Sequence, residues 1–401
     1  MADSADPTAL QRIFLPDIVA SFACRKCGEC CAAWEIPVDR GSYDRAVAAL
    51  GEEALRHLAI ADQFSHFGYA RLKLTGGRCG FQDGSLCRIH RDYGEAVLFP
   101  ECRKFPRIIF RTPLALHCTA SFACRHMLGL LDRPGRVRVL HVTPDRVNFA
   151  PDVCDTVIDE PPALCRGTLM TWDAFFAVEN GLLEILRTAG GSIESRLLTM
   201  IEFVRTLARD ADSPLQRETV DRELQAARVD SFHELRSRFL LVPHSPDAQV
   251  EFIMSAILGR MQGPELREWE RGPLQTALKR WASLPDGRRR DGYLHDCRRL
   301  YLTASERVRL ILENYLICRV CGNPDFVLHG VETGLHAAAA LLAIIRAAAV
   351  AEAADDGEMA PEAMLRAVRA VDTAFFHLPD FADNVAKRRI DPAALLVLTP
   401  G

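Results

Sequence analysis

The spacing of apolar residues changes partway along the chain. After about residue 168, apolar residues recur every three to four positions, which is typical of helices that bury one face. "TWDAFFAVENGLLEILRTAG" (171–190) and "SIESRLLTMIEFVRTLARD" (192–210) show this spacing most clearly. The same pattern predicts further helices over 214–239, 246–262, 264–283, 303–319, 330–354, 361–376 and 380–388.

The earlier part of the chain contains short runs that are typical of strands. "YARLKL" (69–74) leads into a Thr-Gly-Gly turn, which predicts a strand that ends there. "RIIFR" (107–111) and "LALHC" (114–118) are separated by Thr-Pro, and this arrangement predicts a hairpin. "RVRVLHV" (136–142) and "RVNFA" (146–150) predict a second hairpin by the same argument.

These two sequence patterns, helical in the later part and strand-like in the earlier part, predict an α+β protein with two parts. We expect a cysteine-rich α+β head at residues 1–158 and a mainly helical body at residues 168–401. The segment "DEPPALCRG" (159–167) between them is rich in proline and polar residues and is predicted to be a linker. A chain of 401 residues is long enough for two or three domains.

Composition and charge narrow the class of protein. The chain is 49% hydrophobic and 25% charged, as in ordinary soluble proteins, and its net charge of −4 argues against a general nucleic-acid binder. The most apolar stretch, residues 335–354, is mostly alanine and contains Arg346. It is therefore predicted to be a buried helix and not a membrane span. The first twenty residues lack the features of a signal peptide, so we expect a cytoplasmic protein with reduced thiols.

Cysteine clustering is the strongest chemical signal in the sequence. "CRKCGECC" (24–31) places four cysteines in eight positions, and nine of the fourteen cysteines precede residue 125. Thiolates bind zinc and iron, and two cysteines separated by two residues can reach one ion across a tight turn, which Gly28 permits. Burial as ordinary small side chains explains any single cysteine, but not this cluster. The predicted metal ligands are Cys24, Cys27, Cys30, Cys31, Cys79, Cys87, Cys102 and Cys118.

The pattern leaves the identity of the metal open. Four cysteines form the usual structural zinc site of a cytosolic protein. The consecutive pair Cys30-Cys31 is unusual for such a site and favours an iron–sulfur cluster, such as a 4Fe-4S cluster. His90 follows Cys87 by three residues, a spacing that also allows a role as a ligand. Arg103, Lys104 and Arg107 follow Cys102 and could neutralise thiolate charge.

These motifs resemble two related families. "CRKCGECC" resembles the start of the YkgJ-type cysteine-cluster proteins, which chelate zinc or iron. "CGFQDGSLCRIHRDYGEAVLFPECRKFPRI", followed by "LALHC", is similar to the flagellin lysine-N-methylase (FliB-like) branch. That branch also has a late "ENYL", found here at residues 313–316. The tight spacing of the first cysteines is closer to the general cluster family.

The resemblance implies an enzyme that transfers a methyl group from S-adenosylmethionine to lysines of bacterial flagellin and that requires an iron–sulfur cluster. It also implies that Glu313, Asn314 and Tyr315 contribute to cofactor binding. The residues themselves show no glycine-rich loop of the Rossmann type. They also do not select a catalytic base, since spacing does not distinguish among the candidates Glu35, Asp39, Tyr43, Tyr93 and Glu95.

Two other functions fit the same cysteines. The first is a metal-binding protein without catalytic activity, whose head folds around zinc or iron. The second is a redox protein that uses an iron–sulfur cluster for electron transfer. Metal content and methyl-transfer activity distinguish these functions from the methylase.

Overall fold

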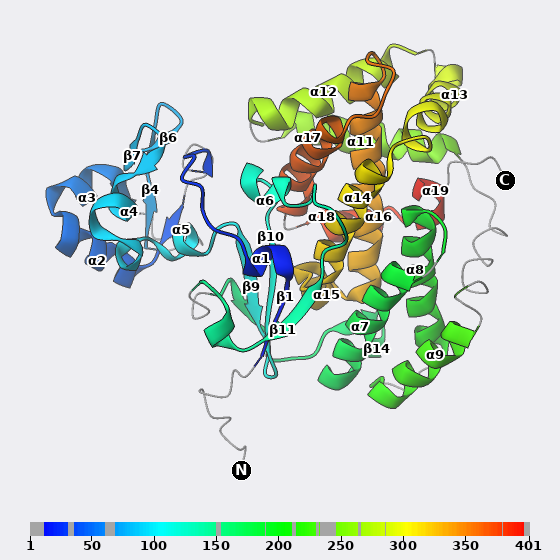
Figure 1. Ribbon diagram of the computed structural model, residues 1–401, viewed down its shortest axis with the longest axis horizontal. Coiled ribbons are helices and arrows are strands. Elements are labelled where there is room, and N and C mark those ends of the chain that lie inside the picture. Colours follow the sequence, from blue (N-terminus) through cyan, green and yellow to red (C-terminus); the bar gives the residue numbers. More distant parts are fainter. Residues whose placement is uncertain are drawn as a thin grey trace.

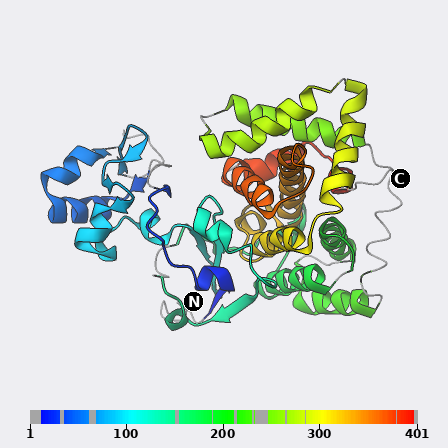
Figure 2. The same cartoon turned by 45° about the horizontal axis from the view of Figure 1, so that its top comes forward.

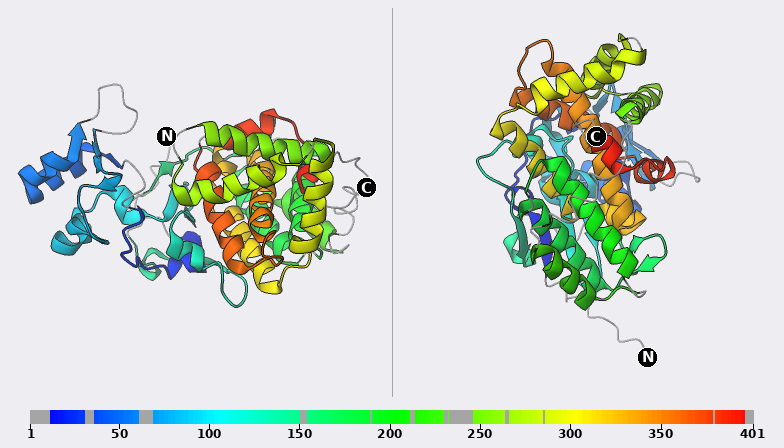
Figure 3. Two further views of the ribbon diagram at one scale, coloured as in Figure 1. Left: turned by 90° about the horizontal axis from the view of Figure 1, so that it is seen from above. Right: turned by 90° about the vertical axis from the view of Figure 1, so that its right-hand side faces the viewer.

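The computed structural model shows a small N-terminal lobe attached to a larger helical body (Figure 1). It describes residues 12–30, 36–60, 69–149, 154–188, 190–210, 214–229, 232, 246–263, 266–284, 286–378 and 380–396. The predicted α+β class, with a cysteine-bearing N-terminal part and a helical body, is confirmed. Two further orientations also show the lobe projecting from the body (Figures 2 and 3).

The lobe comprises the described residues between 36 and 104 and has a small core of its own. Its sheet has the strand order β2-β4-β3, and two short hairpins, β5–β6 and β7–β8, follow it. Ten buried apolar side chains, among them Leu72, Phe81 and Phe99, form the core. The elements are β2 (Pro37–Val38), α2 (Arg40–Leu50), α3 (Glu52–His57), β3 (Leu58–Ile60), β4 (Ala70–Leu72), β5 (Leu74–Thr75), β6 (Arg78–Cys79), β7 (Gln82–Asp83), β8 (Leu86–Cys87), α4 (Arg88–Tyr93), η2 (Glu95–Val97) and α5 (Pro100–Lys104).

A five-stranded sheet joins the lobe to the body. Its order is β11-β1-β10-β9-β12, in which β1 runs parallel to β10 and antiparallel to β11. The predicted hairpin between β9 and β10 is confirmed. The strands are β1 (Ile13–Pro16), β9 (Arg107–Arg111), β10 (Leu116–Ala120), β11 (Val139–Val142) and β12 (Thr156–Val157), and the short helices α1 (Asp17–Ala20) and α6 (Arg125–Gly129) follow β1 and β10.

The second predicted hairpin, over residues 136–150, is wrong. Strand β11 forms as predicted, but it pairs with β1, and Ile13 lies opposite Val142. The expected turn is a short 3-10 helix, η3 (Pro144–Arg146), and the described residues 147–149 after it form no strand. Strand β1 thus occupies the position beside β11 that the sequence pattern predicted for residues 146–150. This pairing is favoured because it buries Ile13 and Leu15 of β1.

The body is built from helices packed around α16. Each of the nine predicted helical segments contains a helix, although residues 230–231 and 233–239 of the segment predicted over 214–239 lie outside the described residues. The charged helix α13 was not predicted. The elements are β13 (Ala163–Cys165), β14 (Thr168–Leu169), α7 (Trp172–Thr188), α8 (Ile193–Asp210), α9 (Arg217–Val229), α11 (Pro246–Gln262), α12 (Glu268–Ala282), α13 (Asp286–Asp296), η4 (Cys297–Tyr301), α14 (Glu306–Val320), α15 (Pro324–His329), α16 (Val331–Ala353), α17 (Pro361–Val371), η5 (Asp372–Phe376), α18 (Phe381–Lys387) and α19 (Pro392–Leu396).

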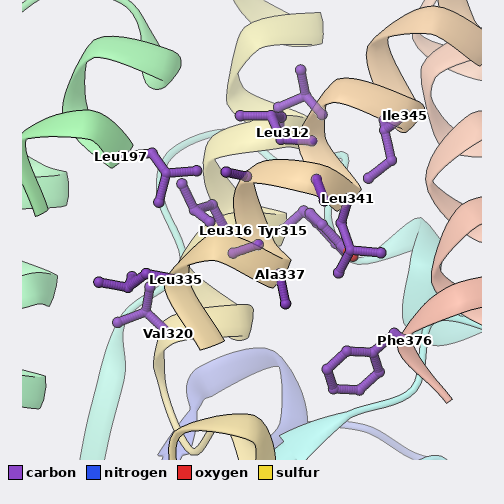
Figure 4. Close-up of a cluster of buried hydrophobic side chains, with 14 of the residues drawn as sticks. Leu197, Leu312, Tyr315, Leu316, Val320, Leu335, Ala337, Leu341, Ile345 and Phe376 are labelled. Atoms are coloured by element: carbon purple, nitrogen blue, oxygen red, sulfur yellow. The ribbon is translucent and has the colours of Figure 1, made fainter. Parts of the chain in front are cut away.

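Helix α16 is the central helix of the body. It is long and apolar enough to cross a membrane by length and composition, but 94% of its most apolar window is buried inside the protein, as the sequence predicted. Leu335, Leu341 and Ile345 of α16 belong to the same buried cluster as Leu312 and Leu316 of α14 and Leu197 of α8 (Figure 4). Its alanines allow neighbouring helices to approach closely. Arg346 is fully buried and is satisfied by Glu194 and by the carbonyl oxygens of Leu395 and Leu396.

Apolar side chains form two clusters that do not follow the predicted division at residues 158–168. The smaller cluster belongs to the lobe, whereas the five-stranded sheet shares the large cluster with the helices. The segment predicted to be a linker includes β13, and its Leu164 is fully buried against the body. The domain boundary at residues 158–168 stays a prediction.

Candidate metal centre

The first cysteine motif forms a tight turn against hairpin β7–β8. Gly28 adopts a left-handed φ of 73°. A Cβ atom at this position would lie 2.5 Å from Nε2 of Gln82 and 3.0 Å from the carbonyl oxygen of Ser85, so a larger residue would push the hairpin away. Gln82 Nε2 also donates a hydrogen bond of 3.2 Å to the carbonyl oxygen of Gly28. The turn and the hairpin that carries Cys87 are therefore held together.

Two hairpins place the next two predicted ligands. Cys79 ends β6 opposite Leu74, and Cys87 ends β8 opposite Gln82. Gly76 and Gly77, which join β5 to β6, both have positive φ, as tight hairpin turns require. The sequence predicted the first of these turns from its Thr-Gly-Gly motif. Cys87 is also the N-cap residue of α4, which begins at Arg88.

Five of the predicted ligands surround one cavity of about 640 Å³: Cys24, Cys30, Cys79, Cys87 and Cys102. They come from three separate segments of the chain. Although Cys102 keeps an exposed surface, desolvation by the surrounding protein raises its pKa well above its usual range, and nearby Cys79, Cys87 and Cys30 raise it further because neighbouring thiolates repel one another. Burial likewise raises the pKa of Cys79, with additional contributions from Cys87 and Cys30. Cys30 and Cys87 are thus close enough to Cys79 and Cys102 to affect the ionisation of these two thiols.

The donor set has the right chemistry for zinc or iron. Thiolate sulfur is the preferred protein ligand of zinc and of iron–sulfur clusters, and the cavity has more such donors than one four-coordinate site needs. Among the residues that the structure describes, no group of three or more His, Cys, Asp or Glu side chains is yet close enough to hold an ion. Cys31 lies outside the described residues. Five cysteines therefore line one cavity without forming a preformed coordination sphere among the described residues.

Cys27 does not line this cavity and lies near a cysteine that was not predicted as a ligand. Cys124 precedes α6, and burial raises its pKa to about 11, with smaller contributions from Cys30 and Cys27. Cys124 is thus a further potential ligand on the body side. Its position among the nine early cysteines was the only sequence signal for this role, because no short spacing connects it to the motif at 24–31.

Glu29 ties the cysteine turn to the body. Its carboxylate accepts hydrogen bonds from Arg125 at 2.8 Å and from Arg369 of α17 at 2.6 Å. Although partial burial raises the pKa of Glu29, these two arginines lower it below its usual value. Arg369 also lies over the ring of Trp269, 4.0 Å from its centroid. The segment between Cys24 and Cys30 therefore contacts both the lobe and the helical body.

The opposite wall of the cavity belongs to the sheet and to the C-terminal helices. Lys104, predicted to lie near thiolates, forms ion pairs with Glu101 and Asp155. Ser121 Oγ lies 2.8 Å from Nε2 of His377, although 256 positions separate the two residues in sequence. Burial lowers the pKa of His377, so its ring is neutral at physiological pH. Local motifs gave no signal for His377.

Of three other residues that the sequence placed near the metal, two line the cavity and one does not. His90 lines it, as the spacing from Cys87 allowed, and so does Arg107. Arg103 does not line it. None of the candidate bases that the structure describes, Asp39, Tyr43, Tyr93 and Glu95, lines it either, and Glu35 lies outside the described residues. Asp39 instead caps α2 by accepting a hydrogen bond from the backbone N–H of Ser42.

Cys118, the last predicted ligand, does not line this cavity. It lies on β10, is completely buried, and is close enough to Cys321 to contribute to the raised pKa of that thiol. Gly322 packs directly on the backbone of Cys118, where an added Cβ would lie 3.3 Å from it. The structure therefore places Cys118 with the late pair Cys318 and Cys321 inside the body.

A buried acid lies beside this second group of cysteines. Glu179 of α7 accepts a hydrogen bond from the backbone N–H of Gly322, and its Oε2 lies 3.8 Å from Nδ1 of His117. Burial raises the pKa of Glu179 to about 7 and lowers that of His117 to about 3. The His117 ring stacks on Phe110, and neither of its nitrogens has a hydrogen-bond partner among the described residues.

Glu179→Gln is expected to change how stability depends on pH. Because the folded-state pKa of Glu179 is raised from 4.5 to about 7, its contribution is fully present below pH 4.5 and is lost as the pH rises through 7. The loss is on the order of 3 kcal/mol. We expect urea unfolding to show that, between pH 4.5 and pH 8, the free energy of unfolding of the variant rises by that amount relative to that of the natural protein. His117 makes the free energy of unfolding fall as the pH drops below 6.5, but it does so equally in the natural protein and in the variant. A pH-independent difference would contradict the prediction.

The three residues predicted to bind the cofactor are all used in internal contacts of α14. Asn314 donates to the carbonyl oxygen of Leu131 and accepts from the N–H of Val137. Tyr315 donates to Asp372 at 3.1 Å, and Glu313 pairs with two arginines, Arg136 and Arg196. None of the three lines the cavity. Their role in binding S-adenosylmethionine stays a prediction.

Comparison with known proteins agrees with the predicted cysteine-cluster region. Residues 23–119, about a quarter of the chain, match the family model CxxCxxCC, which is described as "Putative zinc- or iron-chelating domain". The matched region includes all eight predicted ligands. This match does not support the resemblance to the FliB-like branch, which stays a prediction. No curated protein and no solved structure matched the chain. The N-terminal region is thus similar to a family of zinc- or iron-chelating domains.

Proposed function

We propose that the protein binds zinc or iron through the cysteines around the cavity. Cys30, Cys79, Cys87 and Cys102 form the central set, because the first three all raise the pKa of Cys102, and Cys24 lies on the same cavity. The observation that carries the proposal is the arrival of five cysteines from three chain segments at one cavity. A bound metal would join these segments and stabilise the small lobe, and an iron–sulfur cluster would also allow electron transfer.

Metal analysis of Cys102→Ser tests this proposal. Hydroxyl oxygen is a poor replacement for thiolate at a zinc or iron–sulfur site, so metal content should fall at least about tenfold. Cys165→Ser is the matched control, because Cys165 is a cysteine of the body that does not line the cavity. Both proteins should be purified without oxygen and their zinc, iron and sulfide measured. Equal metal content in Cys102→Ser and the control would contradict the proposal.

A second candidate function is methyl transfer from S-adenosylmethionine to a lysine of flagellin. Two observations favour an enzyme. The cavity of about 640 Å³ is in the range of small-molecule sites, roughly 300–1,000 Å³, and is much larger than one metal ion requires. His377, neutral and hydrogen-bonded to Ser121, faces the cavity and could accept the proton that an ammonium must lose before methylation.

Transfer of a labelled methyl group tests the second candidate. The metal-loaded protein would be incubated without oxygen with labelled S-adenosylmethionine and bacterial flagellin. Label on lysine that disappears in His377→Gln, with metal content unchanged, would support the enzyme. An iron–sulfur absorption spectrum without transfer would instead support the redox function, and bound zinc without transfer would support a metal-binding protein without catalytic activity.

A further inference from the structure

We propose that the end of the cavity formed by the sheet is a second binding site, which takes the carboxylate of a small organic acid through Arg107. This site shares its cavity with the thiols, and Cys24 and Cys118 lie close enough to Arg107 to act on its charge, but carboxylate binding goes beyond the proposed metal binding. Arg107 is the first residue of β9 and lines the cavity together with Ser121. The two residues share one end of the sheet, since Arg107 lies opposite Ala120, the residue before Ser121.

Arg107 is a buried cation whose hydrogen-bonding capacity is only partly used. Its side chain is 7% exposed. Nη2 donates to the carbonyl oxygen of Phe22 and to Oδ1 of Asn148, each at 3.0 Å. Nε has no hydrogen-bond partner among the described residues. The guanidinium also lies 4.5 Å from the ring centroid of Phe149, which fixes its plane.

No carboxylate of the described residues forms an ion pair with Arg107. The two acidic side chains of the same cavity wall, Glu101 and Asp155, both bind Lys104 instead. Asp155 also accepts a hydrogen bond from the N–H of Ile109 through its second oxygen. A buried guanidinium without a paired anion is costly, and this cost is removed when a ligand supplies the anion. A carboxylate matches the guanidinium best because it accepts hydrogen bonds in the same plane.

The rest of the cavity lining indicates what chemical group the ligand carries besides its carboxylate. Phe81, Leu98, Phe99 and Ile108 line the cavity with apolar surface. A metal ion held by the cysteines would fill only part of a cavity of about 640 Å³. The remaining space suits a compact apolar or aromatic group attached to the carboxylate. The hydrogen-bonded Ser121 and His377 offer a polar contact next to that group.

Calorimetry with 4-phenylbutyrate and its neutral amide tests the proposal. The natural protein should bind the acid at least about tenfold more tightly than the amide, whether or not metal is bound. Arg107→Gln should remove this preference. Arg111→Gln is the matched control, because Arg111 is on the same strand but does not line the cavity. Ile108→Phe narrows the cavity and keeps Arg107, so it should weaken the binding of both 4-phenylbutyrate and its amide. This variant tests the site if Arg107→Gln fails to fold.

Each outcome decides the proposal independently of metal binding. Equal affinity for acid and amide, or no binding of either at millimolar concentration, would overturn it. An acid preference that survives in Arg107→Gln would overturn it as well. A third outcome is that Arg107→Gln loses metal and the natural protein does not bind 4-phenylbutyrate. Arg107 would then only balance thiolate charge, and the proposal would again be overturned. Metal content measured on the same samples shows separately whether the metal centre exists.

Discussion

Replacing Arg319 with methionine is expected to lower the free energy of unfolding by about 3–5 kcal/mol. Arg319 is 1% exposed and forms an ion pair of 2.8 Å with Asp372, which is fully buried. The substitution keeps most of the side-chain volume but leaves the carboxylate of Asp372 buried without its cation. An uncompensated buried charge is among the most destabilising changes that one substitution can make.

Arg319 also joins parts of the chain that are far apart in sequence. Its Nη2 donates to the carbonyl oxygen of Ala120 at 2.7 Å, and its guanidinium lies 3.7 Å from the ring centroid of Phe376. It therefore joins α14, the end of β10 and the segment just before His377. These are the elements that place Ser121 and His377 beside the cavity. We expect the variant to bind phenylbutyrate more weakly even where it remains folded.

Urea unfolding monitored by circular dichroism measures the loss. The double variant with Asp372→Asn should recover part of the stability, because it removes the unpaired charge. Arg307→Met, on the same helix, is the control: its pair with Asp132 is at the surface, and its loss should cost less than about 1 kcal/mol. A similar effect of the two single substitutions would show that burial of the ion pair is not the cause.

The sequence predicted those elements whose signals are local. The helical spacing predicted the long helices of the body, and the Thr-Pro turn predicted the β9–β10 hairpin. Helix α13 was not predicted because its segment "GRRRDG" has too few apolar residues to show a periodic face. The second hairpin was wrong because β11 pairs with β1, more than one hundred residues earlier in the chain, and no local pattern reveals such a partner.

The same limit applies to the candidate site. Short cysteine spacings indicated the region that matches a family model of zinc- or iron-chelating domains, and five predicted ligands lie on one cavity. Cys118 has no short spacing to the others, and the structure places it near Cys321, inside the body. The contribution of His377 depends on the packing of the whole body against the sheet. Such tertiary contacts between distant segments cannot be predicted from residue spacing alone.

Removal of the metal is expected to unfold the lobe and to leave the body folded. The lobe has only ten buried apolar side chains in its core, so its packing alone supplies little stability. Structural zinc sites contribute roughly 10–16 kcal/mol of binding free energy to the folding of small domains. The body has the large cluster around α16 and no cysteine of the cavity, so it does not depend on the metal in this way.

Hydrogen exchange before and after chelation under reducing conditions measures this difference. Amides of the lobe, for example in α2 and α4, should exchange at least about a hundredfold faster after chelation, while amides of α16 should be unchanged. The helical signal in circular dichroism should remain largely intact, because the longest helices are in the body. The Cys102→Ser protein should exchange rapidly in the lobe even without chelator. Slow exchange in a metal-free lobe would show that its own core suffices, and the cysteines would then need an explanation other than stabilising the fold. Loss of protection in α16 would show that lobe and body fold as one unit, because cooperative unfolding spreads through shared packing.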